Sequence, residues 1–304
     1  MRRNNPTIAL VGATATGKTS LAVALAHALD GEVINADSMQ FYRGMDIGTA
    51  KATGPERGGI AHHLLDIYDL DVEASVAQFQ HLARQTISEI RSRAKVPILT
   101  GGSGLYVRAA LDTLEFPPTD DQLRQQLSEQ VAQEGTTPLL QELQPVDPEA
   151  AERLQDNRRI IRAVEVYRLT GRPFTSYMPK REYHAEIPPV VQIGLGIDRA
   201  QLHQRIEERV HTMLQNGWVA EVQRLMTQGL AQAPTASRAI GYRQIMDCLA
   251  GRTTEQEALN STIVATRRFA RRQETWFKAD PRVHWVDAES DNLTAQALSV
   301  VPSD

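Results

Sequence analysis

The chain has 304 residues, of which 41% are hydrophobic and 23% are charged, a composition typical of a globular protein with one large core and room for a smaller domain. The net charge of -4 and the pI near 6.1 do not indicate a nucleic-acid-binding domain that is basic overall, so such a function would depend on local clusters. One cysteine excludes an internal disulfide framework and a cysteine-based zinc site, and the lack of any apolar run near the roughly 18 residues of a membrane span predicts a soluble cytoplasmic protein.

The N-terminal third predicts a parallel α/β sheet, because short apolar runs alternate with longer segments of helical spacing. The expected strands lie at 7–11, 32–36 and 96–100, and the expected helices at 20–29 and 73–94. Ligands of open parallel sheets gather at the carboxyl ends of the strands. Gly12, Asp37 and Ser103 are all expected at that edge.

The rest of the chain predicts a helical insertion followed by a return to the core. Between residues 112 and 189 the strand signals vanish and the sequence becomes polar and helical. We expect the core to resume with a strand at 190–198, helices at 199–216, 218–228 and 254–278, and a last strand at 283–286. Cys248 follows an apolar stretch, so we expect it to be a small buried hydrophobic residue.

A phosphate-binding loop connects the first predicted strand to the first predicted helix. Residues 12–19 match the pattern G-x-x-x-x-G-K-[ST] in that structural context. Glycines let backbone N–H groups surround a diphosphate, Lys18 reaches the outer phosphate, and the Thr19 hydroxyl can bind Mg²⁺. We therefore expect an α/β fold with a P-loop NTPase-like core at 1–111 and 190–304, in which helices flank a parallel sheet, and a helical insertion domain at 112–189.

Other polar residues near the same edge leave more than one interpretation open. Asp37 fits a magnesium-shell carboxylate, a general base or a helix cap. The glycine-rich turn at 101–106 brings the Ser103 hydroxyl toward the same anion. Arg205 and Arg209 lie one helical turn apart and fit either a phosphate clamp or a surface helix. His62 and His63 lack a third ligand at metal spacing, which favours a structural role.

Two clusters of arginines are candidates for contacts with nucleic acid. On a helix, arginines three or four positions apart repel one another unless an anion lies across them. The clusters are Arg158, Arg159 and Arg162, and then Arg267, Arg268, Arg271 and Arg272. From charge alone, two solvated helix faces are the favoured explanation.

Several blocks of sequence resemble the bacterial tRNA dimethylallyltransferases, which are also called tRNA isopentenylpyrophosphate transferases. Between the P-loop and residue 278 they occur in the order found in that family. The blocks are residues 37–51, 62–66, 101–106, 159–167, 241–244 and 271–277. Two departures are modest, because the family commonly has Pro where this chain has Ala13 and Thr where it has Ser103. Since Ser103 keeps the hydroxyl group of threonine, only the fine positioning of that hydroxyl group is affected.

The resemblance implies an activity and a set of site residues. The family transfers the dimethylallyl group from dimethylallyl pyrophosphate to N6 of the adenosine immediately 3′ of the anticodon, in tRNAs reading codons that begin with U. The implied catalytic residues are Asp37, Lys18 and Ser103, with Mg²⁺ on Thr19. The implied pyrophosphate-binding residues are Gly12, Ala13, Thr14, Ala15, Thr16, Gly17, Lys18, Thr19 and Arg209. The implied tRNA-binding residues are Asp37, Ser38, Met39, Gln40, Ser103, Arg158, Arg159, Ile160, Ile161, Arg162, Arg238, Gly241, Tyr242 and Arg243.

Two other functions compete with this interpretation. A P-loop small-molecule kinase would share the fold, the lysine and the magnesium but would use ATP as the donor. A non-catalytic tRNA-binding or GTP-switch protein fits less well, because no N-K-x-D motif for reading guanine occurs in the chain. For the transferase we expect tRNA and dimethylallyl pyrophosphate as partners, no membrane, and a monomer.

Overall fold

The computed structural model describes residues 5–178, 180–187 and 189–302. The chain divides into two compact units: unit 1 comprises Met1–Leu111 with Tyr183–Asp304, and unit 2 comprises Asp112–Glu182. The insertion predicted at 112–189 differs from unit 2 at its C-terminal end, where residues 183–189 belong to unit 1. These residues pair with unit 1, since the Pro189 carbonyl accepts the Thr7 N–H at 2.8 Å and the Leu111 carbonyl accepts the His184 N–H at 2.8 Å.

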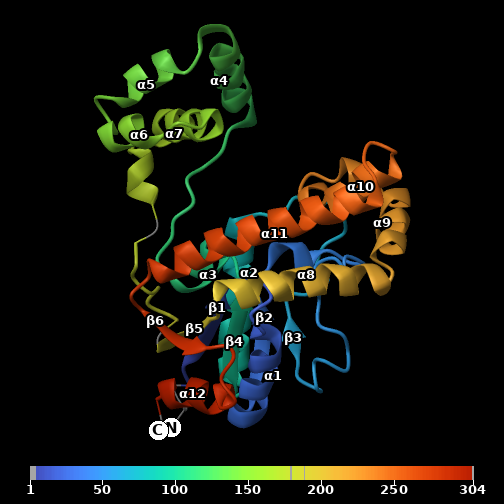
Figure 1. Cartoon of the computed structure of the whole chain (residues 1–304). Coiled ribbons are helices and arrows are strands. Elements are labelled where there is room, and N and C mark those ends of the chain that lie inside the picture. The colour runs from blue at the N-terminus through green and yellow to red at the C-terminus, as the bar shows by residue number, and fades with distance from the viewer. Residues whose placement is uncertain (1–4, 179, 188, 303–304) are drawn as a thin grey trace. The chain divides into compact units, whose positions relative to one another are not determined.

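The described residues of unit 1 form one six-stranded sheet in the order β3-β2-β4-β1-β5-β6 (Figure 1). Every pair of neighbouring strands is parallel, which confirms the predicted sheet. The strands are β1 (Thr7–Gly12), β2 (Gly31–Asn35), β3 (His62–His63), β4 (Val96–Gly101), β5 (Val190–Gly196) and β6 (Val283–Asp287). The central strands β1 and β4 are almost continuously apolar because helices cover both faces of the sheet.

Alternating side chains of the strands pack against different helices. Ile8 and Ile98 belong to the cluster that holds α1 (Lys18–Leu29) and α12 (Leu293–Val300) against one face. Their neighbours in the strands, such as Leu99, point the other way and are equally buried. That face is covered by α2 (Val76–Ser92) and α3 (Gly104–Leu111). The carboxyl ends of β1, β2 and β4 remain free for the loops that carry the functional residues.

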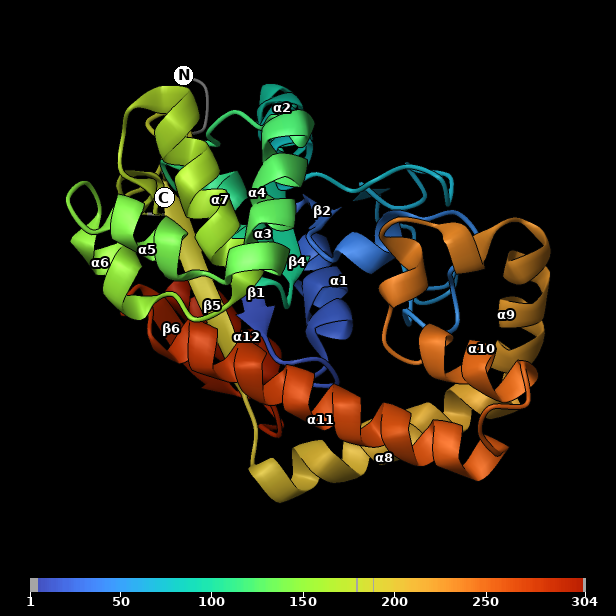
Figure 2. The ribbon, with the colours of Figure 1, turned by 90° about the horizontal axis from the view of Figure 1, so that it is seen from above.

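Four helices extend beside this edge of the sheet. They are α8 (Arg199–Gln215), α9 (Trp218–Thr227), α10 (Tyr242–Leu249) and α11 (Glu255–Lys278). Figure 2 shows α8 and α11 side by side, with α9 and α10 connecting them at one end. A capping box fixes the start of α11, where the Thr254 hydroxyl and the Glu257 carboxylate satisfy each other's backbone N–H groups.

The described residues of unit 2 form helices that are joined by loops. It contains α4 (Asp121–Glu134), α5 (Thr137–Leu143), α6 (Pro148–Arg153) and α7 (Asn157–Thr170). The core of unit 2 includes Leu127, Leu139, Leu143, Ile160 and Val164. Its amphipathic helices thus bury a core separate from that of unit 1.

Some elements differ from the sequence predictions. His62 and His63 form the two-residue edge strand β3, which is too short for an apolar run to predict it from the sequence. Helices α10 and α12 were not predicted. The prediction that Cys248 is buried was wrong: it is only partly buried, because α10 turns Ile245 and Met246 inward instead. In the part of the chain that the structure describes, no helix is long and apolar enough to cross a membrane.

Candidate active site

The P-loop connects β1 to α1 in the conformation that anion binding requires. Gly12 and Gly17 have φ values of 140° and 90°, which favour glycine, and Gly17 precedes the first turn of α1 without a side chain to cap it. The Thr16 hydroxyl donates to the Ala13 carbonyl at 2.9 Å, and Lys18 Nζ donates to the same oxygen at 2.5 Å. The N-terminal N–H groups of α1 are therefore open to an anion.

A polar cavity of about 480 Å³ lies in front of this loop. Its walls come from the P-loop, the end of β2, the loop over 46–56, the end of β4 and helix α8. The polar and charged residues that line it are Thr14, Lys18, Thr19, Asn35, Asp37, Gln40, Asp46, Thr49, Lys51, Thr53, Glu56, Thr100, Arg209, Thr212, Asn216 and Gln273. A lining that combines cations, hydroxyl groups and several carboxylates suits a phosphate chain that carries a metal ion.

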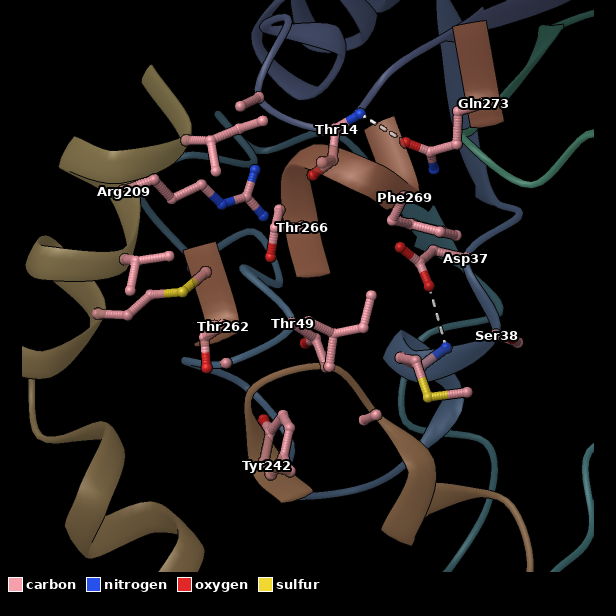
Figure 3. Close-up of a pocket in the computed structure, with 18 of the residues that line it drawn as sticks. Thr14, Asp37, Ser38, Thr49, Arg209, Tyr242, Thr262, Thr266, Phe269 and Gln273 are labelled. Atoms are coloured by element: carbon pink, nitrogen blue, oxygen red, sulfur yellow. Dashed lines mark hydrogen bonds between the residues drawn. The ribbon is translucent and has the colours of Figure 1, made fainter. Parts of the chain in front are cut away.

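A second cavity of about 360 Å³ has a more apolar wall. Figure 3 shows Thr262, Thr266 and Phe269 of α11 around this cavity, with Tyr242 at the end where Thr262 lies. Its further lining includes Ser38, Met39, Ser103, Ile206, Val210, Met213, Trp218, Arg238 and Arg272. The two cavities share the residues Thr14, Ala15, Asp37, Thr49, Arg209, Met213 and Gln273. Unit 1 thus places an apolar space directly beside a phosphate-binding space.

Three ionisable groups influence one another where the cavities meet. Burial raises the pKa of Asp37 above its usual value, while the Met39 N–H at 3.0 Å, Lys18 and Arg209 oppose that rise. Burial, assisted by Arg209, lowers the pKa of Lys18 to about 7, and Asp37 opposes that shift. Burial also lowers the pKa of Arg209, against the effect of Asp37 and Glu56. A carboxylate and two cations in such surroundings are typical of a functional site.

Comparison with known proteins identifies the family. A family model described as IPP transferase matches residues 40–280. The tRNA dimethylallyltransferase of Pseudarthrobacter chlorophenolicus is 60% identical over 295 residues, which cover 97% of this chain and 98% of that protein. The one of Streptomyces coelicolor is 52% identical over 299 residues, covering 97% and 95%.

The chain belongs to the IPP transferase family.

Solved structures agree with this assignment. The full-length tRNA isopentenylpyrophosphate transferase from Bacillus halodurans has a TM-score of 0.72 and 39% identity, covering 97% of this chain and 95% of that chain. A eukaryotic dimethylallyltransferase acting on tRNA has a TM-score of 0.82 and 25% identity, covering 97% and 77%. The names of these relatives support the transferase interpretation of the P-loop, and not the kinase alternative.

In this IPP transferase family member, the structure brings most of the predicted unit 1 residues to the two cavities. Lys18, Thr19 and Gln40 line the polar cavity, and Ser38, Met39, Ser103, Arg238 and Tyr242 line the apolar one, while Thr14, Ala15, Asp37 and Arg209 line both. Ala13 and Thr16 are buried within the P-loop itself. Gly241 and Arg243 line neither of these cavities. Arg205 is paired with Glu289, so of the two arginines considered for a phosphate clamp only Arg209 lines the site.

The predicted tRNA-binding residues of unit 2 occupy three different environments. Arg158 and Arg159 are exposed on α7. Ile160 and Ile161 are only 1% and 7% exposed and belong to the core of unit 2, so their side chains are not available to RNA. The Arg162 guanidinium donates to the buried Glu165 carboxylate at 2.7 Å and to the carbonyls of Pro117 and Pro118 at 2.8 Å. Within this cluster, the two exposed arginines are the ones accessible to a phosphate.

Helix α11 contributes site residues that the sequence prediction missed. The Gln273 side chain accepts the Thr14 N–H at 2.9 Å and thereby connects α11 to the P-loop (Figure 3). Thr262, Thr266 and Phe269 line the apolar cavity from the same helix. The one sequence signal for a shared helix face is spacing. Positions 262 and 266 are four residues apart, as are positions 269 and 273, and residues four apart lie on the same side of a helix.

Proposed function

We propose that this chain transfers the dimethylallyl group of dimethylallyl pyrophosphate to N6 of the adenosine immediately 3′ of the anticodon, in tRNAs reading codons that begin with U. The C–O bond to pyrophosphate breaks, a C–N bond forms, N6 loses one proton, and pyrophosphate leaves. The observation that carries the proposal is the pair of adjoining cavities, one polar and one apolar, with Asp37 and Arg209 in the wall of both. A prenyl pyrophosphate combines a charged diphosphate, which fits the polar cavity, with an apolar hydrocarbon group, which fits the apolar one.

The polar cavity supplies stabilisation for the departing pyrophosphate. Charge develops on this group as the allylic C–O bond breaks, so Lys18, Arg209 and the N–H groups of the P-loop lower the barrier when they already face that position. Among the described residues, no three His, Cys, Asp or Glu side chains are close enough to form a metal site on their own. Mg²⁺, which commonly keeps waters and phosphate oxygens as ligands, fits Thr19 with few other protein ligands. It would neutralise charge on the leaving group.

Asp37 is proposed to act on the incoming amine. The exocyclic nitrogen of adenine is a weak nucleophile, and a carboxylate that accepts one of its hydrogens both orients it and takes up the proton as the C–N bond forms. Ser103, in the wall of the same cavity, adds a hydroxyl group that can contact the base or the developing charge. An adenine in the anticodon loop is unpaired, so turning it out of its stack costs little.

For tRNA binding we propose Ser38, Met39, Gln40, Arg238 and Arg243 in unit 1 and the exposed Arg158 and Arg159 in unit 2, whereas Gly241 and Tyr242 are buried and support these residues from behind. Phosphate contacts of this kind position an RNA without reading its sequence. We also propose that the monomer is the active form.

A transfer assay tests the proposed function directly. The purified protein, Mg²⁺ and labelled dimethylallyl pyrophosphate are incubated with a tRNA that reads UNN codons, and the RNA is digested to nucleosides. We expect label in a single modified adenosine, and no label in a matched tRNA whose adenosine 3′ of the anticodon is replaced by guanosine. Isothermal titration with ATP and with dimethylallyl pyrophosphate provides the contrast: tight binding of ATP alone would support the kinase instead.

A further inference from the structure

Glu221 of helix α9 is a buried carboxylate to which the proposed mechanism gives no role. Its side chain is only 6% exposed. It accepts three consecutive backbone N–H groups, those of Asp46 at 3.0 Å, Ile47 at 2.8 Å and Gly48 at 3.2 Å. The Tyr242 hydroxyl donates a fourth hydrogen bond at 2.6 Å. Successive N–H groups that point to one anion form a nest, and hydrogen bonds to a charged acceptor are about twice as strong as neutral ones.

The loop held by Glu221 forms a wall of both cavities. Most residues of the segment 46–56 line the polar cavity, Gly48 lines the apolar cavity, and Thr49 lines both. Farther along the loop, Lys51 Nζ donates to the Asp46 carboxylate at 2.7 Å, and its side chain is 2% exposed. The position of Asp46 therefore influences the side chains around the phosphate-binding space.

Close packing leaves this loop little freedom to settle elsewhere. A Cβ atom added at Gly48 would lie 2.1 Å from Trp218 Nε1 and 2.5 Å from Tyr242 Cε2, so the loop backbone lies directly on the side chains of α9 and α10. Figure 2 shows α9 and α10 beside the blue segment that follows β2. The contacts join residues that are 173 to 175 positions apart in the sequence, so local structure alone cannot make them.

We propose that Glu221 is a positioning residue of the donor site: it fixes loop 46–49 against α9 and α10, so that the wall of the pyrophosphate cavity is formed before the donor binds. This inference rests on the proposed function, because it takes dimethylallyl pyrophosphate as the donor. A wall that is already in place spares the donor the cost of ordering it. Loss of the carboxylate therefore weakens donor binding more than it slows transfer once the donor is bound.

The test compares Glu221→Gln with Asp147→Asn. Asp147 in unit 2 is a matched control, since it is also buried and accepts the Ala150 N–H, the Thr175 N–H and the Thr175 hydroxyl. For Glu221→Gln we expect KM for dimethylallyl pyrophosphate to rise roughly tenfold, while kcat at saturating donor changes by less than about threefold. Hydrogen exchange at the amides of residues 46–48 should become faster in this variant alone.

The outcomes separate positioning from general destabilisation. Unchanged donor KM and unchanged exchange at residues 46–48 in Glu221→Gln would overturn the proposal, and so would an equal rise of donor KM in Asp147→Asn. Should Glu221→Gln fail to fold, Gly48→Ala displaces the loop from Trp218 without altering the carboxylate, and the same rise of donor KM is expected. An unchanged KM there would also reject the role. Failure of the proposed function is distinct, because the wild-type protein would then transfer nothing.

Discussion

At the scale of single residues, the site depends on Asp37, which has two roles to separate. Its carboxylate accepts the Met39 N–H and so caps the short 3-10 helix over Ser38–Phe41, while it also lies in the wall of both cavities. Asparagine is nearly the same shape and caps as well as aspartate does, but it cannot take up a proton at neutral pH. Asp37→Asn therefore removes the proposed chemistry and keeps the local structure.

We expect Asp37→Asn to slow single-turnover transfer by at least about 100-fold, the loss typical of a missing general base. Because burial raises the pKa of Asp37, the wild-type rate should fall with decreasing pH at a higher pH than an exposed aspartate would give. Because the folded state holds the ionised carboxylate less favourably than the unfolded chain does, ionised Asp37 lowers the free energy of unfolding at pH 7, so the variant should be at least as stable as wild type there. Turnover near the wild-type rate would leave the carboxylate as a cap only.

Lys18 leads to a prediction about proton uptake. Its pKa of about 7 means that at pH 8 most of the ligand-free protein carries a neutral Lys18, whereas the unfolded chain is protonated there. Stability from this group is thus lowest below the folded pKa and increases as pH rises toward the unfolded value. Inorganic pyrophosphate should restore the charge, so its binding at pH 8 should take up a proton that is not taken up in Lys18→Met. Titration calorimetry in buffers of different ionisation enthalpy measures this difference.

Arg159 and Arg162 should respond differently to the same substitution. If the exposed Arg159 contacts a tRNA phosphate, Arg159→Ala should flatten the slope of log affinity against log salt by roughly 0.7–0.9 without altering thermal stability. Arg162→Ala removes a partner from the fully buried Glu165, so it should lower the thermal stability of unit 2. Equal slopes of log affinity against log salt for Arg159→Ala and wild type would show that Arg159 contacts no phosphate and belongs to a solvated helix face.

At the scale of secondary-structure elements, the site depends on close packing between α11 and the two glycine-rich turns. A Cβ atom added at Gly102 would lie 2.1 Å from Gln273 Nε2 and 3.2 Å from the Gly12 carbonyl. The glycine thus makes room for the side chain that accepts the Thr14 N–H. This explains why the second turn needs glycine after β4 even where no anion touches it.

Gly102→Ala should displace Gln273 and break its hydrogen bond to the P-loop. Overpacking of this kind typically costs about 1–3 kcal/mol, and donor affinity should fall because Thr14 loses its partner. Gly54→Ala is the matched control, because nothing lies within 4 Å of the added Cβ. Chemical denaturation of both variants and titration with pyrophosphate provide the measurement. Equal stability of the two would show that Gln273 moves aside without cost.

The sequence predicts the part of the site that is made from local signals. The P-loop, the strands before Gly12 and Asp37, and the turn at 101–106 all carry a glycine or apolar pattern that fits one structure. Glu221 and Gln273 carry no such signal, because a polar residue within an amphipathic helix looks like part of its solvated face. Their burial depends on partners more than 170 positions away, which periodicity cannot reveal.

The arginine cluster of α7 also shows that the sequence does not reveal contacts between distant segments. Arg159 and Arg162 look equivalent in the sequence, yet only Arg162 is engaged, since Glu165 lies one turn later on its own helix and Pro117 and Pro118 approach from another segment. Helical spacing gives the Glu165 contact, but not the two carbonyls. Ile160 and Ile161, inferred from resemblance as tRNA contacts, follow the apolar period of α7 into the core instead.

At the scale of the whole molecule, unit 2 interrupts unit 1 at a point where the chain nearly closes on itself. The His184 N–H donates to the Leu111 carbonyl at 2.8 Å, so the two ends of unit 1 are within hydrogen-bonding distance. All the residues that line the two cavities, among those that the structure describes, belong to unit 1. We therefore expect unit 1 to bind the proposed donor by itself.

A protein in which residues 112–182 are replaced by a short glycine linker should still bind pyrophosphate and dimethylallyl pyrophosphate with near wild-type affinity. It should bind tRNA much more weakly, because the exposed arginines of α7 are gone. Calorimetry with the donor measures the first affinity, and filter binding with tRNA measures the second. Full tRNA affinity in the shortened protein would remove unit 2 from the proposed interface, whereas loss of donor binding would show that unit 1 needs it to fold.

The hydrogen bond from Thr14 to Gln273 has a consequence for synthesis on the ribosome. The two residues are 259 positions apart, so the P-loop emerges long before the helix that completes its surroundings. Until α11 has left the exit tunnel, Phe269 and Gln273 cannot take their places in the cavity walls. A nascent chain arrested before that point presents its phosphate loop without the side chains of α11 that complete the proposed donor pocket, so any nucleotide that fits the loop is free to compete for it.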